Sequence, residues 1–122
     1  MASILIAEDS QTDAQFIKSV LDKSGHNLFL ATDGEEAEKM VKNQPFDLII
    51  LDVVMPKKNG FQLCREFKRN EKTKSIPIIV LTSKSQESDK MWGTKQGADA
   101  YLTKPCAPIE LLETVKKLLG RQ

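Results

Sequence analysis

Short apolar segments of strand length recur five times along the chain, and they constrain its fold more than any other feature. They lie at residues 3–7, 27–31, 47–51, 77–81 and 99–102. Most of these segments are continuously apolar, which is typical of β-strands that are buried on both faces of a parallel sheet. The sequence therefore predicts a sheet that is covered on both sides.

Patterns with helical periodicity fill the intervals between these segments. The clearest stripe repeats at i, i+3, i+4 and i+7 and consists of Gly60, Leu63, Cys64 and Phe67. A similar stripe occupies residues 111–119, and shorter ones occupy residues 17–21 and 37–41. Strand and helix thus alternate five times, which predicts an α/β fold whose parallel strands are joined by right-handed helical crossovers.

The fourth helical pattern, residues 85–96, is poor in apolar residues. Its only large apolar side chains are Met91 and Trp92, so we expect this helix to be the least buried. Core packing is the expected role of Trp92, although aromatic residues and methionines also serve as anchors for binding partners.

Two helix starts carry recognisable capping residues. Asp33 with Glu36 three residues later is the pattern of a capping box. After the fourth strand, Thr82, Ser83 or Ser85 could each cap the following helix, because hydroxyl side chains suit that position.

Length and charge exclude several classes of protein. A chain of 122 residues has the length of one domain, so we expect a single domain over residues 1–122 without an output domain. Lys and Arg number 18 against 17 Asp and Glu, and a net charge of +1 gives no electrostatic reason to expect nucleic acid or membrane as a partner. Cys64 and Cys106 form neither a disulfide framework nor a metal cluster, which fits the cytoplasm.

Charged and hydroxyl side chains follow the predicted strands at the points where these end. Glu8 and Asp9 follow the first, Asp52 the third, Thr82 the fourth and Lys104 the fifth. In open α/β sheets, ligands bind at the carboxyl ends of the strands. Clustered carboxylates favour a hard divalent cation such as Mg²⁺, and a lysine and a hydroxyl beside them suit phosphoryl transfer. A carboxylate can itself be the nucleophile and form an aspartyl phosphate.

These residues resemble the receiver domains of two-component response regulators over essentially the full chain. The matching positions are Glu8-Asp9, Asp52 with Met55-Pro56 and Gly60, Thr82, and Tyr101 with Lys104-Pro105. The resemblance implies a flavodoxin-like fold with strand order 2-1-3-4-5. It also implies that a histidine kinase or its phosphotransfer domain is the partner that phosphorylates Asp52. The Lys104-Pro105 bond is often cis in this family.

The resemblance further implies a role for each site residue. Mg²⁺ would be bound by Glu8, Asp9, Asp52 and the backbone carbonyl of Val54. Lys104 would contact the phosphoryl group, Thr82 would hydrogen-bond it, and Tyr101 would change rotamer. Val54 and Lys84, each two residues beyond a site residue, would tune the lifetime of the phosphorylated form.

The similarity is to stand-alone, chemotaxis-type regulators, which act by binding other proteins. The expected output surface comprises the fourth helix, the fifth strand and the fifth helix, on a monomer or weak dimer. Residues 86–93 and 96–98 are similar to regulators of type IV pilus twitching motility, so control of chemotaxis or pilus motility is expected. No enzymatic activity is expected beyond the domain's own phosphoryl transfer and dephosphorylation.

Three rival functions are weighed against this interpretation. A haloacid-dehalogenase-type enzyme needs a second Asp two residues after Asp52, where this chain has Val54. A flavin-binding protein needs a phosphate-cradling loop after the first strand, where Glu8 and Asp9 would repel phosphate. A degenerate receiver that serves as a phosphorylation-independent scaffold usually lacks a site residue, and none is lacking here.

Four other residues have plainer expected roles. Cys64 lies on the apolar helical stripe and is expected in the core. His26 is expected to face solvent or the last carbonyls of a helix. Lys57 and Lys58 are expected to form a solvated turn.

Overall fold

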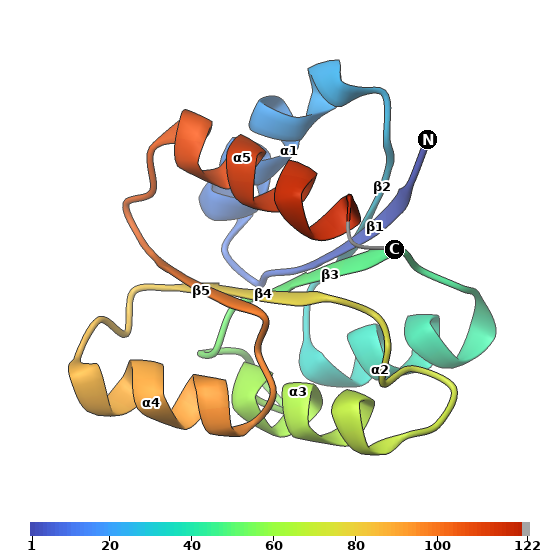
Figure 1. Ribbon diagram of the computed structural model, residues 1–122, viewed down its shortest axis with the longest axis vertical. Coiled ribbons are helices and arrows are strands. Elements are labelled where there is room, and N and C mark those ends of the chain that lie inside the picture. Colours follow the sequence, from blue (N-terminus) through green and yellow to red (C-terminus); the bar gives the residue numbers. More distant parts are fainter. Residues whose placement is uncertain (121–122) are drawn as a thin grey trace.

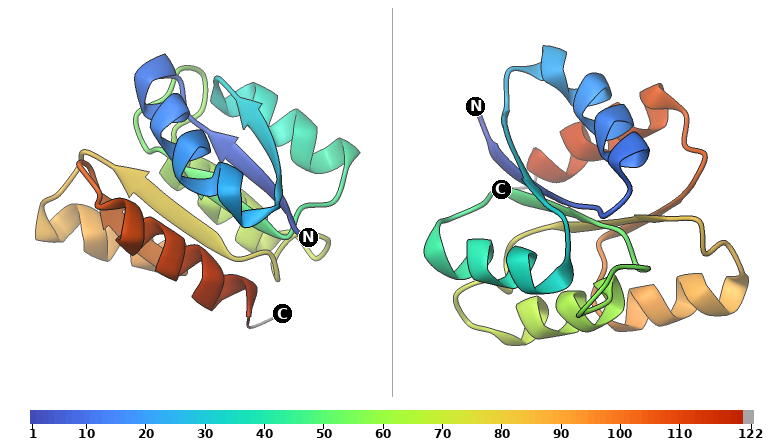
Figure 2. Two further views of the ribbon diagram at one scale, coloured as in Figure 1. Left: turned by 90° about the horizontal axis from the view of Figure 1, so that it is seen from above. Right: turned by 180° about the vertical axis from the view of Figure 1, so that it is seen from behind.

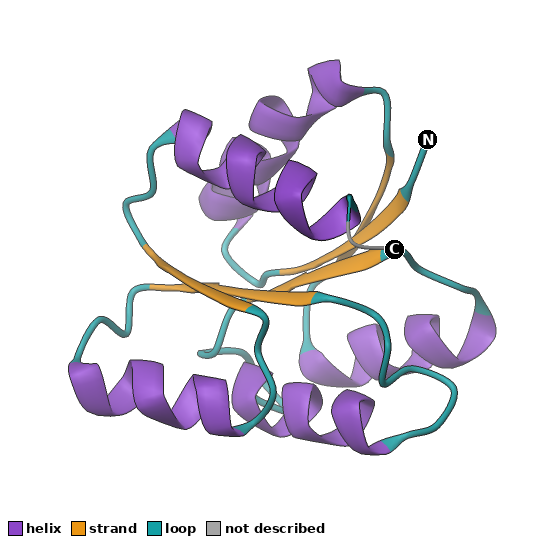
Figure 3. Ribbon diagram, viewed as in Figure 1, coloured by secondary structure: helices purple, strands orange, loops and turns teal. Residues whose placement is uncertain are grey.

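The computed structural model describes residues 1–120 and contains a five-stranded parallel sheet (Figures 1 and 3). The strands are β1 (Ser3–Ala7), β2 (Asn27–Ala31), β3 (Leu48–Leu51), β4 (Ile78–Thr82) and β5 (Ala100–Thr103). Their order across the sheet is β2-β1-β3-β4-β5, and every neighbouring pair is parallel. This confirms the flavodoxin-like α/β fold and its strand order.

Five α-helices cover the two faces of this sheet (Figure 2). They are α1 (Gln11–Leu21), α2 (Gly34–Asn43), α3 (Gly60–Arg69), α4 (Glu87–Lys95) and α5 (Pro108–Leu119), and a 3₁₀ turn, η1 (Asp22–Ser24), follows α1. Helices α1 and α5 lie on one face, whereas α2, α3 and α4 lie on the other. Among residues 1–120, no helix has the length and apolarity that a membrane span requires.

Alternate residues of the central strands enter two different hydrophobic cores. Ile4 and Ile6 of β1 pack on the side of α1 and α5, whereas Leu5 packs on the side of α2 and α3. In β3, Ile50 belongs to the first core and Ile49 to the second. Successive side chains of a strand point to opposite faces, so a sheet that is covered on both faces needs apolar residues at every position.

The helix starts differ from the expected capping pattern. The Oδ1 atom of Asp33 accepts a hydrogen bond from the backbone N–H of Glu36 at 2.8 Å, as expected. However, the Glu36 carboxylate accepts from the N–H of Thr32 at 2.6 Å, one residue before the cap, so the reciprocal bond of a capping box is absent. Helix α4 is capped by Gln86, whose N–H donates to Asp89, so the expectation of a cap at Thr82, Ser83 or Ser85 was wrong.

Helix α4 is the least buried α-helix, as expected, and Gly93 is its only buried residue. Met91 is 65% exposed and Trp92 is 49% exposed. The expectation that Trp92 packs in the core was therefore wrong. The helix has no apolar stripe of its own, so it lies on the sheet without inserting a large side chain into it.

Lys58 does not lie in a solvated turn as expected. Its Nζ atom is 2.7 Å from Glu38 Oε2 of α2 and 2.9 Å from Glu66 Oε1 of α3, and it joins these two helices. Lys57 has a positive φ of 73° and lies 3.6 Å from the carboxylates of Asp33 and Glu35. Ion pairs of Lys57 and Lys58 thus link this turn to α2, to its N-terminal cap and to α3.

Two further side chains can be compared with their expected places. Cys64 is fully buried in the core on the α2–α3 side of the sheet, as expected. The expectation for His26 was wrong, because its Nδ1 atom accepts a hydrogen bond from the backbone N–H of Ala2 at 3.0 Å. This bond ties the start of β2 to the chain just before β1.

Candidate functional site

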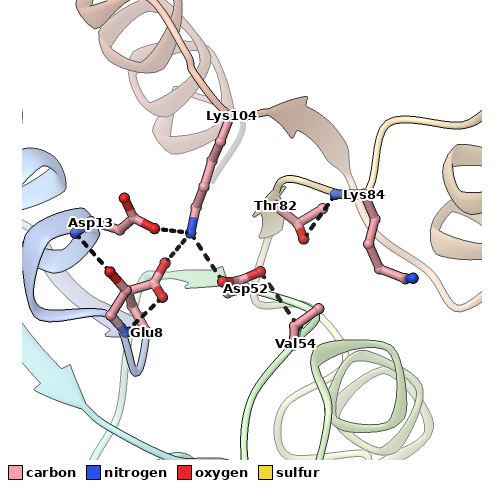
Figure 4. Close-up of polar contacts among 8 residues, drawn as sticks. Glu8, Asp13, Asp52, Val54, Thr82, Lys84 and Lys104 are labelled. Carbon is pink, nitrogen blue, oxygen red and sulfur yellow. Dashed lines mark hydrogen bonds and ion pairs between the residues drawn. The ribbon is translucent and has the colours of Figure 1, made fainter.

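One ammonium group lies among three carboxylates at the carboxyl edge of the sheet (Figure 4). The Nζ atom of Lys104 is 2.6 Å from Glu8 Oε1, 2.7 Å from Asp13 Oδ2 and 3.0 Å from Asp52 Oδ2. Glu8 follows β1 and Asp52 follows the neighbouring β3, whereas Lys104 follows β5, beyond β4, and reaches both carboxylates with its long side chain. The contact between Glu8 and Lys104 spans 96 positions of the sequence.

The backbone fixes each of these residues at the sheet edge. The N–H of Glu8 donates to the carbonyl of Ala31, and that of Asp52 donates to the carbonyl of Ala7. The N–H of Lys104 donates to the carbonyl of Thr82, and the Lys104–Pro105 peptide bond is cis. These bonds extend the sheet pairing by one residue beyond the strands, so the side chains start from defined positions.

Gly60 allows the segment after Asp52 to fold back tightly. The Cα atom of Gly60 lies against the backbone carbonyl of Asp52, and a Cβ atom there would collide with that oxygen. The N–H of Gly60 donates to the carbonyl of Val53 at 3.0 Å, and Asn59 caps α3. The start of α3 is thereby held against the carboxyl end of β3.

Burial shapes the electrostatics of this cluster. Burial raises the pKa of Glu8 to about 7, although the hydrogen bond from Lys104 opposes the shift. Burial lowers the pKa of Lys104, but its hydrogen bonds to Asp13, Glu8 and Asp52 outweigh that effect and raise it above its usual value. Lys104 therefore remains charged at neutral pH and compensates the buried carboxylates.

Glu8, Asp9 and Asp52 form the group of side chains that could hold a metal ion. Each offers a carboxylate oxygen, and these oxygens lie within 4.8 Å of one another. Glu8 and Asp52 are buried and Asp9 is exposed. An all-oxygen set with one exposed member suits Mg²⁺, which binds few carboxylates and keeps several water molecules. The donor set therefore fits the magnesium ion that the sequence predicts.

Thr82, Lys84 and Tyr101 form a second polar group beside Asp52. Thr82 is fully buried, and its Oγ1 accepts a long hydrogen bond, 3.4 Å, from the N–H of Lys84. The hydroxyl of Tyr101 donates to the carbonyl of Lys84 at 2.7 Å, and burial raises the pKa of Tyr101 to about 12. The backbone of Lys84 therefore connects the threonine to the tyrosine.

Val54 and the side chain of Lys84 flank this arrangement. The backbone N–H of Val54 lies 3.4 Å from Asp52 Oδ1, and its side chain is largely exposed. The Lys84 side chain extends away from Asp52 in Figure 4, and its Nζ atom lies 3.9 Å from Asp89 of α4. The structure thus gathers Glu8, Asp9, Asp52 and Lys104, and it places Thr82, Lys84 and Tyr101 to one side of them.

Asp13 also belongs to the cluster around Lys104, although its sequence context did not predict this. It lies in the first turn of α1, where the Oγ of Ser10 accepts a hydrogen bond from its N–H at 3.2 Å. The signal was an acidic residue in the first turn of a helix that begins at the site edge, but such residues are common because they favour helix starts. Only the fold shows that this carboxylate reaches Lys104.

Comparison with known proteins gives consistent matches. The family model described as the response regulator receiver domain matches residues 4–116. Protein PilH from Pseudomonas aeruginosa is 40% identical over 120 residues, which cover 98% of this chain and 99% of PilH. Other curated relatives are longer regulators, and the chain spans about half of their length.

Solved structures match over nearly the whole chain. A putative response regulator from Chloroflexus aurantiacus superposes with a TM-score of 0.94 at 35% identity, over 98% of each chain. The receiver domain of a sensor histidine kinase from Pseudomonas aeruginosa, whose structure has a magnesium ion coordinated in the active site cleft, has a TM-score of 0.90 at 28% identity, again over 98% of each chain.

Proposed function

The chain belongs to the response regulator receiver domain family, and on that premise we propose that it is a phosphorylation switch whose Asp52 accepts a phosphoryl group from a histidine kinase or its phosphotransfer domain. Receiver domains are signalling domains rather than catalytic enzymes. The observation that carries the proposal is the position of Asp52 at the end of β3, with the Lys104 ammonium 3.0 Å from its carboxylate.

The chemistry assigns distinct tasks to these two residues. A carboxylate oxygen of Asp52 attacks the phosphorus, a P–O bond forms, and the P–N bond to the kinase histidine breaks with its electron pair returning to nitrogen. Lys104 stabilises the charge of the phosphoryl oxygens. In a separate step, water attacks the phosphorus, the P–O bond to Asp52 breaks, and inorganic phosphate and the Asp52 carboxylate are released.

A magnesium ion would be held by Glu8, Asp9, Asp52 and the backbone carbonyl of Val54. When bound, it would neutralise negative charge on the phosphoryl oxygens. Support comes from the three converging carboxylate oxygens and from the related receiver domain with magnesium in its active site cleft.

We propose that Thr82 and Tyr101 pass phosphorylation on to the surface of α4, β5 and α5. Thr82 would donate to the new phosphoryl oxygens, and Tyr101 would change rotamer as the intervening segment moves. Two hydrogen bonds link Thr82 and Tyr101 through the backbone of Lys84, and they support this coupling. A downstream protein would bind the altered surface, while Val54 and Lys84 would set how long the phosphorylated form lasts.

We also propose that the protein acts alone, in the cytoplasm, in the control of chemotaxis or pilus motility. Near-complete mutual coverage with PilH supports a stand-alone regulator. The similarity of residues 86–93 and 96–98 to regulators of twitching motility supports the pilus assignment.

Mass spectrometry after treatment with acetyl phosphate and Mg²⁺ tests the proposal. The wild-type chain should gain one acid-labile phosphoryl group, and Asp52→Asn should gain none. Asp22→Asn makes the same charge change at an exposed residue and should behave as wild type. A folded wild-type chain that takes up no phosphoryl group would overturn the proposal and favour a phosphorylation-independent scaffold.

A further inference from the structure

All three donors of the Lys104 ammonium are in use. A lysine ammonium carries three N–H donors, and here they meet Glu8 at 2.6 Å, Asp13 at 2.7 Å and Asp52 at 3.0 Å. A phosphoryl group on Asp52 would bring new oxygen acceptors to the same ammonium. One phosphoryl oxygen can take over the Asp52 contact, but a second phosphoryl contact requires that Glu8 or Asp13 give way.

The three partners differ sharply in their exposure to water. The side chain of Glu8 is 1% exposed and that of Asp52 is 9% exposed, whereas that of Asp13 is 42% exposed. A buried carboxylate that loses its cation is left uncompensated, but water can solvate an exposed one. Asp13 is therefore the partner whose release costs least.

Asp13 also has room to turn away from Lys104 towards solvent, because its side chain is partly exposed. Together with Lys104 it lines a cavity of about 260 Å³ between α1 and the segment after β5, whose other walls include Phe16 and Cys106. Figure 4 shows Asp13 reaching Lys104 from the α1 side, opposite Thr82. Its carboxylate can leave the ammonium without disturbing Glu8 or Asp52.

We propose that Asp13 is a positioning residue that holds Lys104 in the resting state and competes with the phosphoryl group for this ammonium. The proposal rests on the function proposed above. The negative charge of Asp13, 2.7 Å from the Lys104 ammonium, also repels an anionic group that comes near this ammonium. Asp13 thus shifts the balance of the switch towards the unphosphorylated form.

Beryllofluoride, a phosphoryl mimic, measures this competition. Its affinity for the Mg²⁺-loaded full chain can be followed by the fluorescence of Trp92, the single tryptophan. Asp13→Asn should bind the mimic about threefold to fivefold more tightly, the upper part of the range expected for a partly exposed ion pair. Asp22→Asn, which removes a charge from the turn after α1, should bind it as wild type does.

Asp13→Glu separates this role from a general effect on the start of α1. Glutamate keeps the negative charge in the first turn and can still reach Lys104, so its affinity for beryllofluoride should stay within about twofold of wild type. Unchanged or weaker binding by Asp13→Asn would overturn the proposal, and so would Asp13→Glu behaving like Asp13→Asn.

A second readout needs neither metal nor phosphoryl group. The NMR signal of the Lys104 ammonium should exchange slowly with water in wild type and Asp22→Asn, and faster in Asp13→Asn. Equal exchange in all three would show that Asp13 does not hold the lysine and would overturn the proposal. Failure of the proposed function would appear instead as wild-type protein that binds no beryllofluoride while its ammonium signal still depends on Asp13.

Discussion

Gly93 of α4 lies directly against the ring of Tyr101: a Cβ atom at position 93 would stand 2.8 Å from Cδ2 and Cε2 of that ring. The ring also stacks on Phe61, with centroids 6.5 Å apart, and its hydroxyl donates to the carbonyl of Lys84. The missing side chain at position 93 is therefore what gives the tyrosine its place beneath α4.

Gly93→Ala should displace Tyr101 from this place. The better helix propensity of alanine, about 1 kcal/mol, offsets part of the collision, so the free energy of unfolding should change by about 1 kcal/mol or less. Burial raises the pKa of Tyr101 to about 12, and the displaced hydroxyl should titrate nearer its usual value of about 10. Absorbance of this single tyrosine measures the change, and Ser88→Ala on the exposed side of α4 is the control. An unaltered pKa in Gly93→Ala would show that the ring does not depend on the glycine.

The metal-free protein should lose stability as the pH rises from about 4.5 to about 7. Burial raises the pKa of Glu8 from 4.5 to about 7, so in this window the folded state binds more protons than the unfolded state. The difference between the pKa of Glu8 in the unfolded state and in the folded state corresponds to about 3 kcal/mol of unfolding free energy. Urea unfolding with a chelator present should show this slope in wild type and Glu113→Gln, and Glu8→Gln should lack it. Added Mg²⁺ should flatten the slope, because the metal ion favours the ionised carboxylate. If the slope persists in Glu8→Gln, another group causes it.

Thr82→Ala should uncouple the site from the surface of α4. Addition of beryllofluoride and Mg²⁺ should change the fluorescence of Trp92 in wild type, since the helix that carries this residue borders the moving segment. Without the Thr82 hydroxyl, which now accepts from the N–H of Lys84, the change should shrink several-fold. Thr114→Ala, on α5, should respond fully. Equal responses of wild type and Thr82→Ala would rule out coupling through this hydroxyl.

Val54→Asn should shorten the life of the phosphorylated form. The side chain of Val54 is exposed beside Asp52 and has no group that can align a water molecule, whereas an amide could. A several-fold faster decay, equivalent to about 1 kcal/mol in the barrier, is expected, while uptake from acetyl phosphate stays the same. Val54→Leu, which also lacks such a group, should decay as wild type does. Decay curves that coincide for Val54→Asn and Val54→Leu would contradict the prediction.

Lys58→Met should lower the free energy of unfolding by about 1 kcal/mol or less, the usual size for partly exposed ion pairs. Lys58 joins Glu38 of α2 to Glu66 of α3 with short contacts on both sides. Lys57→Met, whose ion pairs are longer, should have a smaller effect. Chemical denaturation of both variants measures the difference, and an equal loss would show that the link between α2 and α3 adds nothing of its own.

The fold could be predicted from the sequence because burial on both faces of the sheet leaves a local signature. Strands such as β1 and β3 are apolar at consecutive positions, and their ends are marked by Glu8 and Asp52. The expectation that Glu8, Asp9, Asp52 and Lys104 lie together followed from one rule, that the carboxyl ends of parallel strands meet at one edge. These predictions needed no knowledge of side-chain direction.

The contacts that the sequence could not show join residues that lie far apart in the chain and meet only in the fold. The contact of Asp13 with Lys104 spans 91 positions, and nothing near Asp13 in the sequence distinguishes it from an ordinary helix-start residue. The partners of Lys58 lie on two different helices for the same reason. The exposure of Trp92 depends on how α4 rests on the sheet, which its composition leaves open.

Helix α4 buries nothing larger than a glycine, and this has a consequence for how such a domain can evolve. Substitutions at Met91 or Trp92 remove almost no packing from either core, so selection can change these two positions without endangering the fold. Under the proposed function, duplicate copies of the gene could therefore diverge in the partner that α4 binds while keeping the proposed chemistry at Asp52. Because α4 is weakly anchored, the residues that would choose the partner can change while the residues of the proposed switch stay the same.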